Sequence, residues 1–126
     1  MKRLFFLLLL ISLLISGCYQ QERDCKDFHT GTFEFETYLN GQIAKTTFIR
    51  TETIEIDLFL GRSETASIRW INDCEYIVKK LHPKNMAEEK AIHMKILNTE
   101  KNTYTFEYGL VGSKKNKQVG TAIKIK

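Results

Sequence analysis

Three cysteines carry the thiol chemistry of this 126-residue chain, and the first closes a segment with the features of an export signal. The chain starts with positive charge, residues 4–15 are apolar except for Ser12, and the small residues Ser16 and Gly17 precede Cys18. A charged start, a short apolar run and a small-residue cleavage point are typical of a secretory signal peptide. The pattern predicts a lipoprotein signal over residues 1–17, with a diacylglycerol attached to Cys18 as the first mature residue.

The predicted lipid on Cys18 makes the membrane the first expected partner of the mature chain. The residue after Cys18 is Tyr19 rather than aspartate. The best-known sorting rule for lipoproteins therefore favours the outer membrane, in an exported, lipid-anchored location in the cell envelope.

Two thiols remain once Cys18 carries lipid, namely Cys25 and Cys74. An exported location permits oxidation, so the sequence predicts a disulfide between them. In the chain-entropy model a loop of this length stabilises the folded domain by about 4 kcal/mol. The alternative is a pair of reduced thiols, with Cys74 buried in a strand and Cys25 in a tether. The sequence has no C-x-x-C pair and no nearby histidine pattern, which argues against a catalytic or metal role.

The net charge of +4 includes two cations of the predicted signal, so the mature chain is only weakly basic. Its C-terminal end is uneven, with five lysines and no acid in the last thirteen residues. These lysines either touch anionic headgroups or decorate a turn and an edge strand, and the second interpretation is the simpler one. We do not expect a nucleic-acid site.

Alternation of apolar and polar residues is the main structural signal after residue 31, and it predicts short strands. Asn40-Gly41 supplies the two residues that tolerate positive φ in a tight hairpin turn. The strictest alternation runs from residue 53 to residue 60, where an apolar face is expected to be buried and Glu55 and Asp57 to lie on the wet face. The predicted strands cover residues 32–38, 42–50, 53–60, 65–71, 74–81, 91–97, 103–111 and 118–125.

A single interruption separates the fifth and sixth predicted strands. Pro83 ends a strand, and Asn85 can cap a short helix over residues 85–90. The sequence therefore predicts an all-β fold, an antiparallel meander of about eight strands forming a small barrel or a curled sheet, lipocalin-like at most. Residues 18–30 read as a lipidated tether, and residues 31–126 as a single β domain.

The search for catalytic motifs is negative over the whole sequence. It contains no phosphate-binding glycine loop, no G-x-S-x-G elbow and no H-E-x-x-H pattern, so we expect no enzyme, no cofactor and no metal. The densest constellation is residues 69–76, where Trp70 and Tyr76 are expected to meet across a turn at residues 72–73. This pair belongs either to the core or to a pocket. The candidate ligand or partner contacts are Arg69, Trp70, Glu75, Tyr76 and His82.

Residues 69–76 together with residues 84–92 resemble a group of short bacterial envelope lipoproteins whose members often carry the label DNA topoisomerase IV. The resemblance spans most of the mature chain and implies an envelope location rather than an activity. A topoisomerase of that kind needs an ATPase, an acidic metal site and a nucleophilic tyrosine preceded by arginine. No tyrosine in this sequence follows an arginine.

Two functional hypotheses follow from these observations. The first is a non-enzymatic interaction or structural module that presents a strand edge or residues 82–90 to an envelope protein. The second is a lipocalin-like carrier that holds a small apolar molecule inside the barrel. The expected interior residues are Phe33, Phe35, Ile54, Ile56, Tyr104 and Phe106. A cavity larger than a few water molecules would favour the carrier.

Overall fold

The structure is a computed structural model that describes residues 1–4 and 23–126. The predicted lipidation site, Cys18, and most of the predicted signal therefore lie outside the described residues. Among the residues that are described, no helix is long and apolar enough to cross a membrane.

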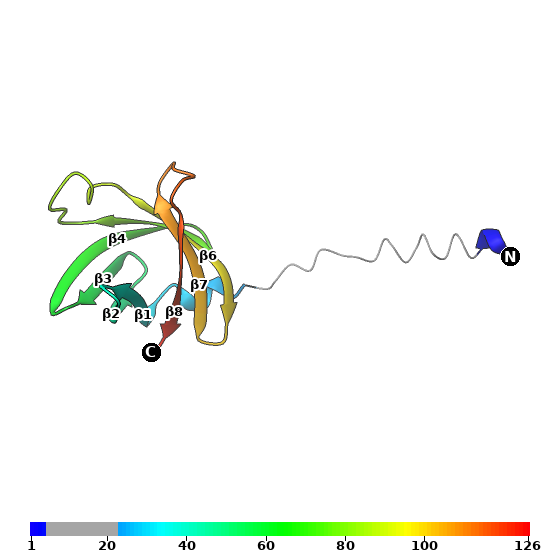
Figure 1. Ribbon diagram of the computed structural model, residues 1–126, viewed down its shortest axis with the longest axis horizontal. Coiled ribbons are helices and arrows are strands. Elements are labelled where there is room, and N and C mark those ends of the chain that lie inside the picture. Colours follow the sequence, from blue (N-terminus) through cyan, green and yellow to red (C-terminus); the bar gives the residue numbers. More distant parts are fainter. Residues whose placement is uncertain (5–22) are drawn as a thin grey trace.

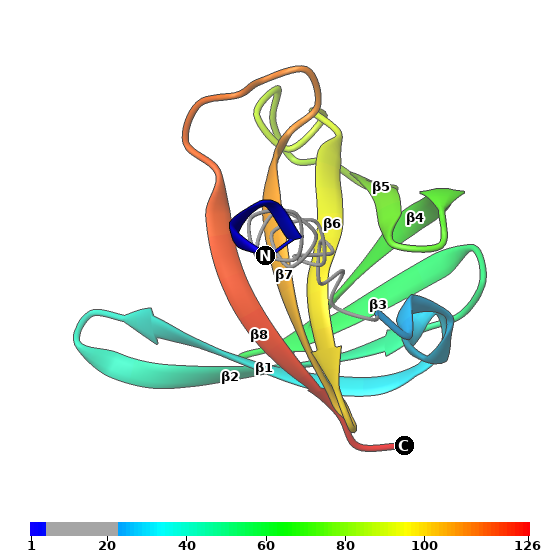
Figure 2. The same ribbon diagram turned by 90° about the vertical axis from the view of Figure 1, so that its right-hand side faces the viewer.

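Eight antiparallel strands follow one another around a closed barrel (Figures 1 and 2). Pairing of the last strand with the first closes it, with Phe33 opposite Lys124 and Phe35 opposite Ala122. Closure decides between the barrel and the curled sheet, and it removes the edge expected at the lysine-rich end. The strands are β1 (Gly31–Leu39), β2 (Gln42–Arg50), β3 (Ile54–Phe59), β4 (Arg62–Asn72), β5 (Glu75–Lys80), β6 (Ile92–Glu100), β7 (Thr103–Leu110) and β8 (Gln118–Lys124).

The hairpin predicted at Asn40-Gly41 is confirmed, because these residues have φ angles of 51° and 77° and link β1 to β2. Figure 2 shows this hairpin projecting beyond the rest of the barrel. The hairpin that joins β3 to β4 differs from the prediction. Leu60, expected to end a strand, lies in the turn itself with φ 49°, followed by Gly61 with φ 73°. Strand β4 consequently starts at Arg62, three residues earlier than expected.

The face that β3 turns inward is the opposite of the one predicted. Ile54 and Leu58 are 38% and 42% exposed, whereas Glu55 is only 8% exposed. The physical reason lies on β2, where Phe48 and Arg50 point into the barrel and Arg50 lies opposite Glu55. A buried guanidinium requires a counter-ion, so the acidic face of β3 turns inward and its apolar face turns outward.

Residues 85–90 form hydrogen-bonded turns instead of the predicted helix. The side-chain oxygen of Asn85 accepts a hydrogen bond from the backbone N–H of Glu88 at 2.9 Å, as expected for a cap, but only one further turn follows. A 3-10 helix, η2 (Cys25–Phe28), lies elsewhere, just before the first strand. Both of its terminal residues are buried, so the packed domain begins near Cys25 rather than at Gly31.

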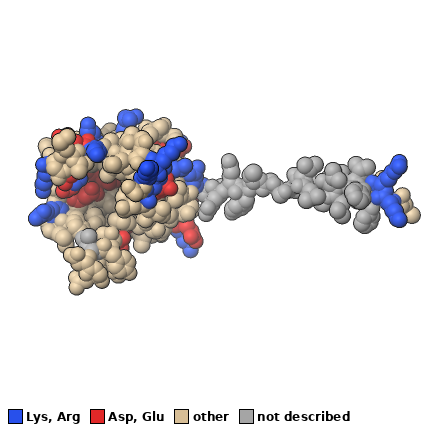
Figure 3. All heavy atoms as spheres, turned by 45° about the horizontal axis from the view of Figure 1, so that its top comes forward, with Lys and Arg blue, Asp and Glu red and all other residues tan. Residues whose placement is uncertain are grey.

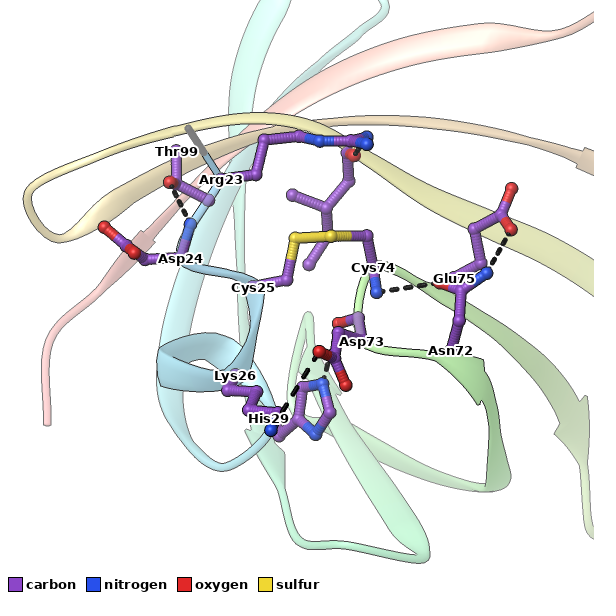
Figure 4. The surroundings of a disulfide bond; sticks show 11 residues. Arg23, Asp24, Cys25, Lys26, His29, Asn72, Asp73, Cys74, Glu75 and Thr99 are labelled. Carbon is purple, nitrogen blue, oxygen red and sulfur yellow. Dashed lines mark hydrogen bonds and ion pairs between the residues drawn. A yellow bond between two sulfur atoms is a disulfide. The ribbon is translucent and has the colours of Figure 1, made fainter. Parts of the chain in front are cut away.

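The predicted disulfide between Cys25 and Cys74 is present, and it joins η2 to the turn between β4 and β5 (Figure 4). That turn falls at residues 73–74, one residue later than predicted. The amide oxygen of Asn72 accepts a hydrogen bond from the backbone N–H of Cys74 at 2.9 Å and shapes the turn. His29 adds a second link, with its Nε2 2.8 Å from the carbonyl oxygen of Asp73.

One end of the barrel interior, next to η2, is filled by side chains. Phe28 and Phe33 are 1% and 0% exposed, and they pack against Tyr104 with ring centroids 5.0 and 5.8 Å away. Ile96 and Ala122 complete this core from β6 and β8. The same strands continue past the core toward the other end, where the interior is different.

Candidate ligand-binding cavity

Arg50 lies at the centre of the filled end, with 2% of its surface exposed. Its Nε donates to Glu55 at 2.8 Å and its Nη1 to the carbonyl oxygen of Phe28 at 2.9 Å. Its Nη2 donates to the hydroxyls of Tyr76 and Tyr104 at 2.7 and 3.1 Å. The guanidinium therefore links β2, β3, β5, β7 and η2, and four of its five N–H donors are engaged within the protein.

Aromatic rings surround the same guanidinium. Its central carbon lies between 4.7 and 5.8 Å from the ring centroids of Phe33, Phe48, Tyr76 and Tyr104, within the range of cation–π attraction. Burial raises the pKa of Tyr76 well above its usual value, so the hydroxyl stays protonated at neutral pH. The side chains at this end of the barrel pack against one another, and Glu55 neutralises the charge of Arg50, so we call this end the filled base of the barrel.

Beyond this base the barrel holds an open cavity of about 350 Å³. The volume lies at the lower end of the range for small-molecule sites. On β1, β6 and β7 the lining begins two residues along from the core, so core and cavity share one continuous interior face. The cavity is lined by Phe35, Thr46, Phe48, Glu55, Asp57, Phe59, Glu64, Val78, Ile92, Met94, Phe106 and Tyr108, which come from seven of the eight strands.

The cavity wall is apolar on one side and acidic on the other. Glu55 forms an ion pair with Arg50. Glu64 forms an ion pair with Lys80, with the ammonium nitrogen 2.8 Å from the carboxylate oxygen. No described residue forms an ion pair or a side-chain hydrogen bond with Asp57. Burial, together with the charges of Glu55 and Glu64, raises the pKa of Asp57 to about 7. In Figure 3, acidic atoms lie in a recess of the barrel with lysine and arginine atoms around it.

The segment 82–90 covers part of this open end. A second hollow of about 370 Å³ lies beneath it and shares Asp57, Val78 and Ile92 with the cavity. The ammonium of Lys80 lies 3.2 Å from Glu88, which ties the segment to β5. Glu88 also accepts a hydrogen bond from the backbone N–H of Lys84 at 2.8 Å. The hydrogen bond from Lys84 and the nearby Lys80 lower the pKa of Glu88, so this link is charged at neutral pH.

Gly120 on β8 makes room for the aromatic part of the wall. A Cβ atom at this position would lie 2.7 Å from the Phe35 ring and 2.8 Å from the Phe106 ring. Both contacts are closer than carbon atoms approach in folded proteins, so any larger residue would push the rings away from β8. Gly120 therefore sets how far Phe35 and Phe106 extend into the cavity.

The five predicted contact residues do not converge on this cavity. Trp70 and Tyr76 meet across the β4–β5 hairpin, with ring centroids 4.4 Å apart, and Tyr76 belongs to the filled base. Arg69 is exposed on the outer face, and Glu75 accepts a hydrogen bond from Asn72 there at 2.6 Å. His82 lies at the rim, in a neighbouring hollow with Arg62, Lys80 and Lys84.

Sequence reasoning missed the charged interior residues Arg50, Glu55, Asp57 and Glu64. A signal for Arg50 was present, because it follows Phe48 by two residues and therefore shares its strand face. An inward-facing Arg50 needs an acidic side chain on the neighbouring strand as its counter-ion. This requirement predicts that the strand face carrying Glu55 points into the barrel. Of the predicted interior residues, Ile54 and Ile56 lie on the outer face, whereas Phe33, Phe35, Tyr104 and Phe106 point inward.

The remaining observations limit the chemistry of the described residues. In residues 1–4 and 23–126, no group of three or more histidine, cysteine or acidic side chains is arranged to hold a metal ion. Two of the five C-terminal lysines make contacts within the barrel: Lys117 pairs with Glu107 at 3.2 Å, and Lys124 donates to the carbonyl oxygen of Asp27 at 2.7 Å. What the interior offers is an open cavity.

Comparisons of the chain with protein-family models, with curated proteins and with solved structures find no match.

Proposed function

We propose that this protein is a small-molecule carrier or sensor of the cell envelope that binds its ligand in the open end of the barrel. The observation that carries the proposal is the unequal filling of the interior. One end is closed by the Arg50 cluster and η2, whereas the other contains a cavity of about 350 Å³. A barrel that needed only a stable core would be filled at both ends, as interiors normally are.

The composition of the wall supports a ligand with an apolar body. Val78, Ile92 and Met94 form an aliphatic side, and Phe35, Phe106 and Tyr108 form an aromatic side. Burying apolar ligand surface against such walls contributes roughly 25 cal/mol per Å². The segment 82–90 lies where it can limit exchange of a bound molecule with solvent.

Native mass spectrometry of the mature protein, purified gently from its own envelope, tests the proposal. The expected result is a mass excess over the denatured chain that disappears on organic extraction. A neutral naphthylamine dye provides the second measurement and should become fluorescent on binding. A protein that leaves the envelope without added mass and does not bind the dye contradicts the carrier function.

The proposal includes a lipid anchor on Cys18 and an exported location, most simply the outer membrane. It is supported by the signal pattern of residues 1–17, by the resemblance to envelope lipoproteins, and by the Cys25–Cys74 disulfide, which requires an oxidising compartment. Metabolic fatty-acid labelling of wild type and Cys18→Ala tests it. Label retained by the variant would overturn the anchor.

Interaction with an envelope protein is the second candidate function, and the outer face of β2 and β3 favours it. Ile49 lies opposite Ile56 on this face, and Ile49, Ile54 and Leu58 are 40%, 38% and 42% exposed. Contiguous apolar surface of this kind often marks an interaction site. A second protein that leaves the envelope with the barrel in native mass spectrometry, and is lost in Ile49→Ser with Ile56→Ser, would support this function.

A further inference from the structure

Among the acidic side chains that line the cavity, Asp57 forms no ion pair with any described residue. This residue projects inward from β3, between the main cavity and the hollow beneath segment 82–90, and it lines both. It lies directly opposite Glu64 of β4 in the register of the two strands. Like charges placed opposite each other on the same sheet face destabilise it.

The cations near Asp57 are already engaged by other acids. Arg50 is held by Glu55 at 2.8 Å in the filled base. Lys80 lies 2.8 Å from Glu64 and 3.2 Å from Glu88. The remaining lysine and arginine side chains at this end, Arg62, Lys84 and Lys90, are exposed, so solvent screens their charges.

The side chains that share the cavity with Asp57 suit a molecule with an apolar part. Val78 and Ile92 adjoin Asp57 in both hollows, and Met94 continues this wall. The faces of Phe35, Phe59 and Tyr108 can also attract a cation, because aromatic rings carry negative charge density on their faces. The acid and the apolar wall thus line the same open cavity of about 350 Å³.

We propose that the cavity selects small amphipathic cations, in particular amines with a compact apolar body, and that Asp57 accepts the ammonium group. The inference rests on the proposed carrier function and specifies its ligand class. A bound ammonium would supply the missing counter-ion for Asp57 and relieve its repulsion with Glu64. Burial, together with the charges of Glu55 and Glu64, raises the pKa of Asp57, which agrees with a carboxylate that a bound cation would stabilise in its charged form.

Three probes of equal chain length test the selectivity: octylamine, octanol and octanoate. Each is titrated calorimetrically into the full-length mature protein at pH 8, where Asp57 is ionised. We expect octylamine to bind about tenfold more tightly than octanol, because one hydrogen bond to a charged group is worth roughly one factor of ten. Octanoate should bind most weakly.

Two variants assign the effect to one residue. Asp57→Asn keeps the size of the side chain and removes its charge, and it should reduce octylamine affinity about tenfold while leaving octanol affinity unchanged. Glu36→Gln is the control, because Glu36 is exposed on the outer face of β1. It should bind all three probes like wild type. Near-UV circular dichroism establishes that both variants are folded.

The outcomes separate this inference from the function on which it rests. Equal affinity for octylamine and octanol, or an unchanged octylamine affinity in Asp57→Asn, would overturn the cation assignment and leave a carrier of neutral molecules. Failure of all three probes and of the naphthylamine dye to bind would overturn both proposals.

Discussion

Arg50 and Glu55 form a buried ion pair, 2.8 Å apart, across the turn that joins β2 to β3. Their side chains are 1% and 10% exposed, so water cannot take the place of either partner in stabilising the other's charge. The pair has two consequences. It neutralises the centre of the filled base, and it determines which face of β3 points into the barrel.

Glu55→Gln should lower the free energy of unfolding by about 3 kcal/mol, because the charge of Arg50 would remain buried without its counter-ion. Urea unfolding followed by the fluorescence of Trp70, the single tryptophan, measures the effect. Glu34→Gln is the matched control, since Glu34 pairs with Lys45 at 3.2 Å on the more exposed outer face, where the loss should stay below about 1 kcal/mol. Equal losses in the two variants would contradict the role of the buried pair.

Cys25→Ser combined with Cys74→Ser should lower the free energy of unfolding by about 4 kcal/mol, because the disulfide spans 49 positions and restricts the unfolded chain. Reduction of the wild type should have a similar effect, measured by the same urea titration. Reductant should change nothing further in the double variant. A wild type that is equally stable with and without reductant would show that the linkage does not support the fold.

Asp57→Asn should change the pH dependence of stability. The folded pKa of Asp57 is about 7, above its ordinary 3.8, so between these values the folded chain binds more protons than the unfolded chain. Wild-type stability should therefore carry a loss that grows as pH rises from about 4 to 7, reaching up to about 4 kcal/mol. Thermal unfolding at pH 5 and pH 8 measures it.

The asparagine variant should gain more stability relative to wild type at pH 8 than at pH 5. Glu36→Gln, on the exposed outer face, should follow the wild-type pH profile. Parallel profiles for Asp57→Asn and wild type would mean that Asp57 is solvated and carries no raised pKa.

Gly120→Ala should narrow the cavity, because the new methyl group would meet the rings of Phe35 and Phe106 at less than 3 Å. We expect weaker binding of the naphthylamine dye and a loss of about 1–3 kcal/mol in stability. Gly109→Ala is the control, since its nearest neighbour is the flexible side chain of Lys117 at 3.3 Å. Unchanged dye binding in Gly120→Ala would show that these two rings do not limit the cavity.

Local patterns predicted most of the fold because they depend on neighbouring residues. Alternation placed all eight strands within a few residues of their observed bounds, and Asn40-Gly41 formed the expected turn. The short helix at residues 85–90 was wrong, because one cap and a few helix-forming residues stabilise turns without the packing that a longer helix needs. The candidate site was largely missed, since its residues come from different strands.

The sequence by itself determined the strand content, the antiparallel order and the pair of cysteines that join. It also predicts an export signal that ends before Cys18. Only the tertiary structure decided that the sheet closes, that β3 turns its acids inward, and that one end of the barrel stays open. The reason is physical. Alternation shows that a strand has two different faces, but the face that is buried depends on the charges of its neighbours. On β3 the buried charge of Arg50 outweighed the hydrophobicity of Ile54, Ile56 and Leu58.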